Sequence, residues 1–135
     1  EQFVALLATT NRVCATNQSY EIGNGPDGNA LAPNSSYTIA GKFFLPSLTE
    51  FDGEQNNNVA EGTVFQAFQN AGTSSSDLRV KYTKDGRPWY YWERSCGPRR
   101  TSSVRYVFEG GHPGSIDSAC GRDYGFAAAC VIKGI

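Results

Sequence analysis

The sequence contains one histidine, no methionine and four cysteines in 135 residues. A single histidine excludes metal sites built from several histidines, and the cysteine positions (14, 96, 120 and 130) lack the close pairs of zinc motifs. The nucleophile-elbow motif and the phosphate-binding glycine loops of nucleotide-binding proteins are also missing. Because the apolar runs are only a handful of residues long, none can span a bilayer. We therefore expect no metal, no cofactor and no membrane partner.

The length of the chain fits one domain, residues 1–135, that buries roughly two-thirds of its surface. A first residue that is Glu1 rather than methionine, together with four cysteines, is typical of a secreted protein whose signal peptide has been removed. We therefore expect an extracellular monomer with two disulfides rather than free thiols. Four cysteines allow three pairings, and their spacing does not select one.

The net charge of −1 hides a marked asymmetry along the chain. Residues 1–78 carry a net charge of −6, whereas residues 79–135 carry +5. Eight basic residues lie within 79–105, against only Asp85 and Glu93. Such an asymmetry indicates a polyanionic partner for one face, the alternative being a solvated basic face without a ligand.

Hydrophobic spacing predicts a helix followed by strands. The apolar positions between Glu1 and Ala15 recur at helical intervals, which predicts one amphipathic helix. Residues 17–36 and 46–58 are polar and are expected to form loops. The segments rich in β-branched and aromatic residues predict strands at Tyr37–Leu45, Val59–Phe68, Leu78–Thr83, Trp89–Arg94, Val104–Glu109 and Phe126–Ile132.

The tetrapeptide Lys84-Asp85-Gly86-Arg87 is the clearest local signal, because Asp-Gly tolerates the positive backbone angles of a two-residue hairpin turn. The predicted fold class is therefore α+β: an N-terminal helix packed on an antiparallel sheet of four or five strands.

The densest group of candidate functional residues lies between positions 89 and 108. Alternation along the strand places Tyr91 and Glu93 on one face and Tyr90 and Trp92 on the other. A carboxylate near several guanidinium groups suits proton abstraction beside a phosphate. Aromatic rings interleaved with arginines suit stacked bases. The plain alternative is an ordinary strand whose Glu93 pairs with a neighbouring arginine.

These segments resemble the small microbial guanyl-specific ribonucleases, the barnase-like and fungal secreted enzymes, over about residues 59–132. Four pieces match the motifs of that family in order: Glu61-Gly62-Thr63-Val64-Phe65-Gln66, Gly86-Arg87-x-Trp89 followed by Tyr90-Tyr91-Trp92-Glu93, Gly97-Pro98-Arg99-Arg100 followed by Arg105-Tyr106-Val107-Phe108, and Gly121-Arg122-Asp123-Tyr124. The resemblance implies a microbial ribonuclease-like fold and an endoribonuclease that cleaves single-stranded RNA through a 2′,3′-cyclic phosphate.

The resemblance also implies roles for individual side chains. Glu93 takes the proton from the 2′-hydroxyl, and Arg105 stabilises the charge that develops on the phosphate. Asp123, which stands where the family has a histidine, or His112 from a nearby turn, protonates the leaving oxygen. The residues implied to bind substrate are Arg99 and Arg100 at the phosphate, Phe65 and Gln66 where the chain leads into the base-recognition loop, Gln69 in that loop, and Tyr91 and Tyr124. Relatives with a disulfide suggest the pairs Cys14–Cys130 and Cys96–Cys120.

Two departures from the family pattern leave the function open. Asp123 is mostly ionised at neutral pH and donates a proton poorly. Gln69 lacks the charge of the glutamate that holds guanine in the family. The alternatives are therefore an endoribonuclease or a catalytically inactive effector or toxin that binds RNA or a host protein. A third alternative, glycan binding through Trp89 and Tyr91, leaves the arginines unexplained.

Overall fold

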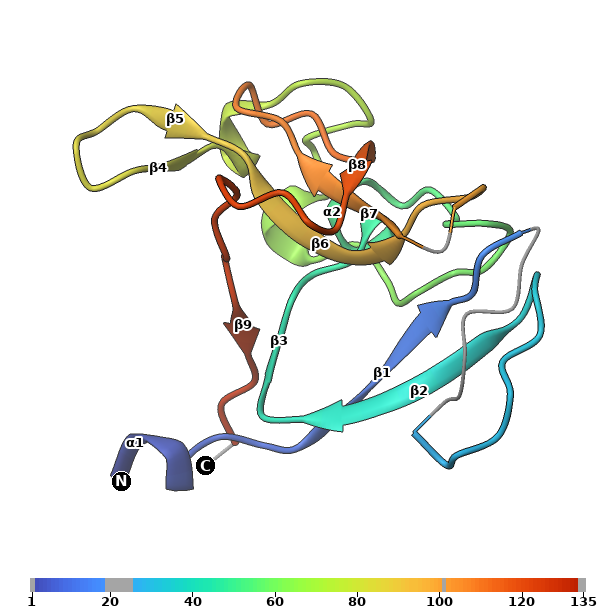
Figure 1. The fold of residues 1–135 in the computed structure, drawn as a ribbon. Helices are drawn as coiled ribbons and strands as arrows, with labels where there is room; N and C mark the ends of the chain where they lie inside the picture. The colour runs from blue at the N-terminus through green and yellow to red at the C-terminus, as the bar shows by residue number, and fades with distance from the viewer. Residues whose placement is uncertain (1, 19–25, 101, 134–135) are drawn as a thin grey trace.

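The computed structural model describes residues 2–18, 26–100 and 102–133, in which short strands dominate (Figure 1). The predicted helix over Glu1–Ala15 is wrong. Only α1 (Gln2–Ala5) is helical there, and the chain continues as β1 (Thr10–Ala15). This strand pairs antiparallel with β2 (Ser36–Gly41) along its whole length. Pairing with a distant segment therefore outweighs the helical spacing of the apolar residues.

The core lies between one short helix and a three-stranded antiparallel sheet. The sheet has the order β6 (Tyr91–Cys96), β7 (Ser103–Val107) and β8 (Ser115–Ser118). Its buried face packs Tyr91 and Val107 against Phe51 of α2 (Leu48–Asp52). Figure 1 shows α2 behind this sheet.

Helix α2 occupies a segment that was expected to be a loop. Ser47 caps its first turn: the Ser47 hydroxyl accepts from the Glu50 N–H, and the Glu50 carboxylate accepts from the Ser47 N–H. Gly53 ends the helix with a positive φ of 85°, a backbone conformation that glycine adopts without strain. The capping box therefore defines a helix of only five residues in a polar, asparagine-rich segment.

The predicted hairpin is confirmed, although its loop is longer than two residues. β4 (Lys81–Tyr82) pairs antiparallel with β5 (Pro88–Trp89). The Gly86 N–H donates to the Thr83 carbonyl at 2.9 Å, and Gly86 has a positive φ of 77°. The loop thus has the glycine conformation expected of a hairpin built on a tight turn.

Other predicted strands are shorter or are replaced by turns. Val59–Phe68 contains no strand in the structure and ends in the 3-10 helix η1 (Gln66–Phe68), while η2 (Asp77–Arg79) precedes β4. Near the C-terminus, only β9 (Ala129–Cys130) is extended, and it pairs with β3 (Phe43–Phe44).

The predicted α+β arrangement, a helix on one sheet of four or five strands with two disulfides, is therefore wrong. The described strands form three two-stranded sheets and one three-stranded sheet. All four cysteines are free, and none lies near another: Cys14 is on β1, Cys96 ends β6, Cys120 is exposed and Cys130 is on β9. Burial raises the pKa of Cys14 and of Cys96 to about 11, so both thiols stay protonated at neutral pH.

The two ends of the described chain meet in an apolar lobe, seen beside α1 and β9 in Figure 1. Leu7 forms a bridge with Ile132, and the Lys133 N–H donates to the Leu6 carbonyl at 2.9 Å. Leu7 is fully buried, whereas Leu6 and Ile132 stay 58% and 64% exposed, so most of the apolar surface of this lobe lies outside the core. In the described ranges no helix is long and apolar enough to cross a membrane.

Candidate nucleic-acid interface

Strand β6 directs Glu93 into the interior, where the residue is 1% exposed. The Gly114 N–H donates to Glu93 Oε1 at 2.7 Å, and Oε2 has no hydrogen-bond partner among the described residues. Burial raises the pKa of Glu93 to about 8, although the Gly114 hydrogen bond and the charge of Arg105 act in the opposite direction. At neutral pH this side chain is therefore mainly a neutral acid enclosed by protein, which is a poor arrangement for a base that must reach RNA.

Arg105 lies beside Glu93, as the resemblance implied, but it too faces inward. Its Nε donates to Asn56 Oδ1 at 2.7 Å, and its Nη1 donates to the Gly114 carbonyl at 2.7 Å. Gly114 thus connects the two side chains, with its N–H bound to Glu93 and its carbonyl bound to Arg105. This arrangement holds the loop at Gly114 against the sheet.

The two candidate acids lie on the surface in separate turns. His112 is exposed, and its carbonyl accepts from the Phe108 N–H at 2.8 Å, which closes a turn after β7. Asp123 is exposed as well, and its carbonyl accepts from Trp89 Nε1 at 2.5 Å. Within the described residues, neither side chain forms a hydrogen bond or an ion pair with Glu93 or Arg105. The structure therefore does not assemble the four expected catalytic residues.

A second buried carboxylate, Glu50, has the partners that Glu93 lacks. Glu50 forms ion pairs with Arg12 at 2.9 Å and with Arg94 at 3.0 Å, and it is fully buried. Arg94 also donates to the carbonyls of Leu45 at 2.6 Å and Glu61 at 2.7 Å. Glu50 is not among the candidates from the sequence, although the spacing of Ser47 and Glu50 is that of a capping box and indicates a helix start there.

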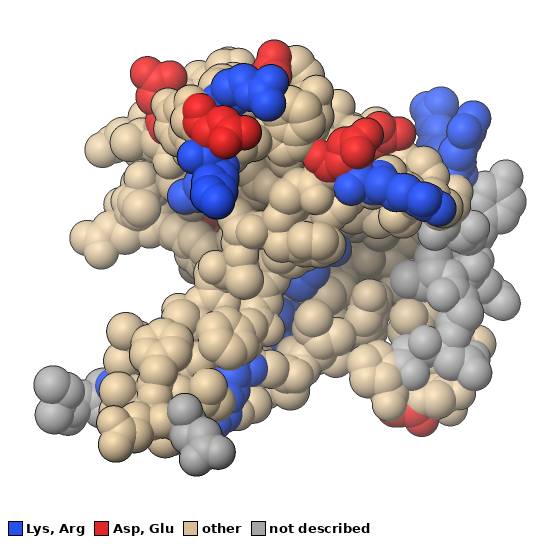
Figure 2. Space-filling view, turned by 60° about the vertical axis from the view of Figure 1, so that its left-hand side comes forward, with Lys and Arg blue, Asp and Glu red and all other residues tan. Residues whose placement is uncertain are grey.

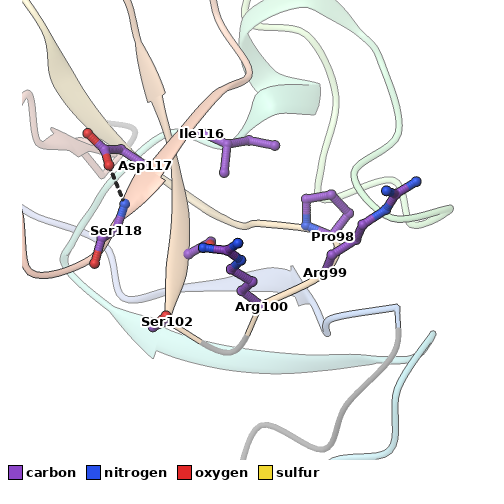
Figure 3. Close-up of a pocket in the computed structure, with 8 residues that line it drawn as sticks. Pro98, Arg99, Arg100, Ser102, Ile116, Asp117 and Ser118 are labelled. Atoms are coloured by element: carbon purple, nitrogen blue, oxygen red, sulfur yellow. Dashed lines mark hydrogen bonds between the residues drawn. The ribbon is translucent and has the colours of Figure 1, made fainter.

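The loop between β6 and β7 forms an open groove of about 370 Å³ with the edge strand β8. Residues 98–100, 102–103 and 116–118 line it, and we call it the arginine groove. Figure 3 shows Arg99 next to Pro98, Arg100 between Arg99 and Ser118, and Ile116 on β8 above Arg100. Both arginines are exposed, and within the described residues neither guanidinium forms an ion pair.

The carboxylate that lines the arginine groove is held by other donors. Asp117 Oδ2 accepts from the Tyr124 hydroxyl at 2.5 Å, and Oδ1 accepts from the Ser118 N–H at 2.6 Å. These hydrogen bonds lower the pKa of Asp117. Figure 3 shows this carboxylate turned toward Ser118 and away from Arg99. The two arginines therefore remain available to an anion from solution.

The expected substrate-binding aromatic residues fall into two environments. Tyr124 stacks on Trp92, with ring centroids 4.0 Å apart, and so completes the outer face of the sheet. Tyr91 is buried, and its hydroxyl donates to the Arg79 carbonyl at 2.6 Å. This burial removes Tyr91 from the surface that glycan stacking would need.

Phe65, Gln66 and Gln69 lie at η1, in the segment implied to recognise a base. The Phe65 ring packs against Phe44 and Phe68, with centroids 6.4 and 6.3 Å away, whereas the side chains of both glutamines are exposed. Phe65 also lines a pocket of about 160 Å³ together with Tyr91. The structure thus brings these two predicted residues to one pocket, at the end of β6 opposite the arginine groove.

An adjoining cleft of about 130 Å³ lies between the β4–β5 hairpin and the segment that follows Tyr124. Residues 81–83, 89–91 and 125–127 line it, and we call it the aromatic cleft. Tyr82 and Phe126 are 66% and 76% exposed there. Neither ring was a candidate in the sequence, because their approach depends on a contact between segments about 40 residues apart.

Charged side chains gather unevenly on the face seen in Figure 2. Lys and Arg side chains stand next to Asp and Glu over the upper half, and the lobe at the lower left shows tan and blue atoms without red. The charge asymmetry of the sequence therefore does not produce one uniform basic face on this side. A polyanion would therefore meet local basic sites such as the arginine groove rather than one continuous basic face.

Among the described residues, no group of three or more histidine, cysteine, aspartate and glutamate side chains is placed to hold a metal ion. No curated protein and no solved structure matches this chain. A family model described as "Domain of unknown function (DUF6273)" matches residues 1–134. The chain therefore belongs to the DUF6273 family.

Proposed function

We propose that the protein binds single-stranded RNA and does not cleave it. The observation that carries this proposal is the arginine groove, in which Arg99 and Arg100 are exposed and have no ion-pair partner among the described residues. Guanidinium groups bind phosphate oxygens through paired, charge-assisted hydrogen bonds. A groove of about 370 Å³ is also large enough for a phosphate with its attached sugar.

Binding without cleavage is favoured by the position of Glu93. Cleavage through the 2′-hydroxyl needs a base within hydrogen-bonding distance of that group. The carboxyl group of Glu93 is enclosed, and one of its oxygens already accepts from Gly114. Neither His112 nor Asp123 is held next to it by a hydrogen bond or ion pair among the described residues. Secretion and action on a host protein stay predictions from the sequence.

The test is the affinity of the protein for a short, fluorescently labelled RNA of mixed sequence, measured by anisotropy. A hydrogen bond to a charged group contributes about 1.5–3 kcal/mol, so the variant Arg99→Gln/Arg100→Gln should bind at least about tenfold more weakly. Arg122→Gln is the matched control, because Arg122 is exposed, carries the same charge and does not line the groove.

Equal losses in the double variant and the control would contradict a specific role for the groove, and no binding by the wild type would overturn the proposal. Gel analysis of the recovered RNA tests whether the protein cleaves the RNA that it binds. Intact RNA supports binding without cleavage. Cleavage by the wild type that Glu93→Gln abolishes would establish the endoribonuclease instead.

A further inference from the structure

The aromatic cleft has no part in the phosphate-binding site described above. It lies at the start of β6, next to Trp89 and Tyr91, whereas the arginine groove follows the end of the same strand. A strand of six residues is roughly 20 Å long. Two sites at this separation fit different parts of one extended ligand rather than one compact small molecule.

The rings at the mouth of the cleft are open to solvent. Tyr82 and Phe126 are among the most exposed large hydrophobic side chains of the described chain, at 66% and 76%. Within those residues neither ring packs against another aromatic ring, whereas Trp89 lies 4.8 Å from Tyr90. Keeping two such rings in water is unfavourable, because each would gain stability from burial against an apolar surface.

The residues that line the cleft favour a ligand that has a flat ring and, next to it, a negatively charged group. Among the described residues that line the cleft, Lys81 alone is charged, and the adjacent turn adds Lys84 and Arg87 against Asp85. A sugar ring needs several polar side chains around its hydroxyl groups. Apart from Lys81, the described lining of the cleft offers the hydroxyls of Tyr82, Thr83 and Tyr90, because that of Tyr91 already donates to the Arg79 carbonyl. An apolar peptide would form no ion pair with the lysines and the arginine at the cleft.

We propose that the aromatic cleft holds a nucleobase of the bound RNA, stacked against Tyr82 and Phe126, with Lys81 beside the neighbouring phosphate. This inference rests on the proposed function, and it differs from the resemblance, which assigned base recognition to the loop around Gln69. Stacking on aromatic side chains is tolerant of sequence, because every base has a flat face. The protein therefore binds the RNA at two points: a phosphate in the arginine groove and a base in the aromatic cleft.

The test compares labelled RNA with an abasic sugar-phosphate strand of the same length. Stacking of one base changes affinity about 5- to 150-fold, so the wild type should prefer RNA by a factor in this range. The variant Tyr82→Ala/Phe126→Ala should lose most of that preference while still binding both strands. Phe43→Ala is the matched control, because Phe43 is exposed but lies on β3, outside the cleft.

A second measurement reports on the cleft directly. Trp89 lines it and Trp92 is buried, so RNA should quench tryptophan fluorescence and the abasic strand should not. Equal wild-type affinity for RNA and the abasic strand would overturn the inference and leave the proposed function intact if Arg99→Gln/Arg100→Gln still weakens both. Absence of binding to either strand would overturn the proposed function itself.

Discussion

The arginines of the interior and those of the loop after β6 differ in what their guanidinium groups contact. Arg79 is fully buried and donates to the carbonyls of Gly111, Phe51 and Gly72 at 2.8, 3.2 and 2.8 Å, and to that of Ser74. Arg99 and Arg100 are exposed and form no ion pair with any described residue. The interior arginines connect loops that have little regular structure, whereas the exposed pair is free to bind a ligand.

This difference changes the meaning of the basic residues between positions 79 and 105. The resemblance grouped Arg99 and Arg105 in a single phosphate site. In the structure Arg105 is bound to Asn56 and Gly114, so only the arginines of the loop face the groove. A guanidinium whose donors already bind carbonyls is structural, and the number of basic residues in a sequence overstates the number available to a partner.

The largest effect on stability should come from Arg79→Ala. The substitution leaves several buried carbonyls without a donor, and each such group costs about 1–3 kcal/mol. We expect the free energy of unfolding in urea to fall by about 4 kcal/mol or more. Arg87→Ala, at an exposed position in the hairpin, should change it by less than about 0.5 kcal/mol. Similar values for the two variants would break the distinction between interior and surface arginines.

The next largest effect should follow the substitution Glu50→Gln. It removes the charge that Arg12 and Arg94 share in the interior, and breaking a buried pair of this kind costs about 3–5 kcal/mol. Thermal unfolding should show a clear loss, whereas Glu54→Gln at an exposed position should be almost neutral. If Glu50→Gln were as stable as the wild type, the interior ion pairs would not hold the fold together.

Glu93→Gln should change how the free energy of unfolding depends on pH. The pKa of Glu93 is raised from 4.5 to about 8, so the folded protein binds the proton more tightly than the unfolded chain. The free energy of unfolding should therefore fall between about pH 4.5 and 8, by up to about 1.4 kcal/mol per pH unit. Urea denaturation at several pH values in this range should show that the free energy of unfolding falls less steeply with pH in Glu93→Gln than in the wild type. An identical slope in both proteins would show that Glu93 is not a buried acid.

The smallest effect on stability should be that of Arg99→Gln/Arg100→Gln. Exposed side chains without partners contribute little to the fold, and we expect a change within about 0.5 kcal/mol. Thermal unfolding of this variant beside the wild type checks the expectation. A larger loss would show that the groove arginines are structural like those of the interior.

Local features could be predicted from the sequence because their causes are local. The Asp-Gly turn identified the β4–β5 hairpin, and alternation placed Tyr91 and Glu93 on the same face, which the structure shows to be buried. The segment Thr10–Ala15 could not be assigned from spacing alone. Its partner, β2, begins at Ser36, and this distant pairing decides the conformation.

The candidate site was predictable in part for the same reason. Arg99 and Arg100 follow Gly97-Pro98, a sequence typical of an exposed turn, and they line the groove. Alternation grouped Glu93 with Tyr91 but did not say which face is buried. The aromatic cleft joins Tyr82 to Phe126 across the chain, and no local pattern could indicate that contact.

The most direct test of the account is the salt dependence of RNA binding. For single strands, each phosphate contact contributes about 0.7 to the slope of log affinity against log salt concentration. We predict that wild-type affinity falls steeply with salt and that Arg99→Gln/Arg100→Gln reduces the slope by about 1.4, whereas Arg122→Gln leaves it unchanged. A wild-type affinity that does not depend on salt, or a slope that the double variant does not change, would contradict the account.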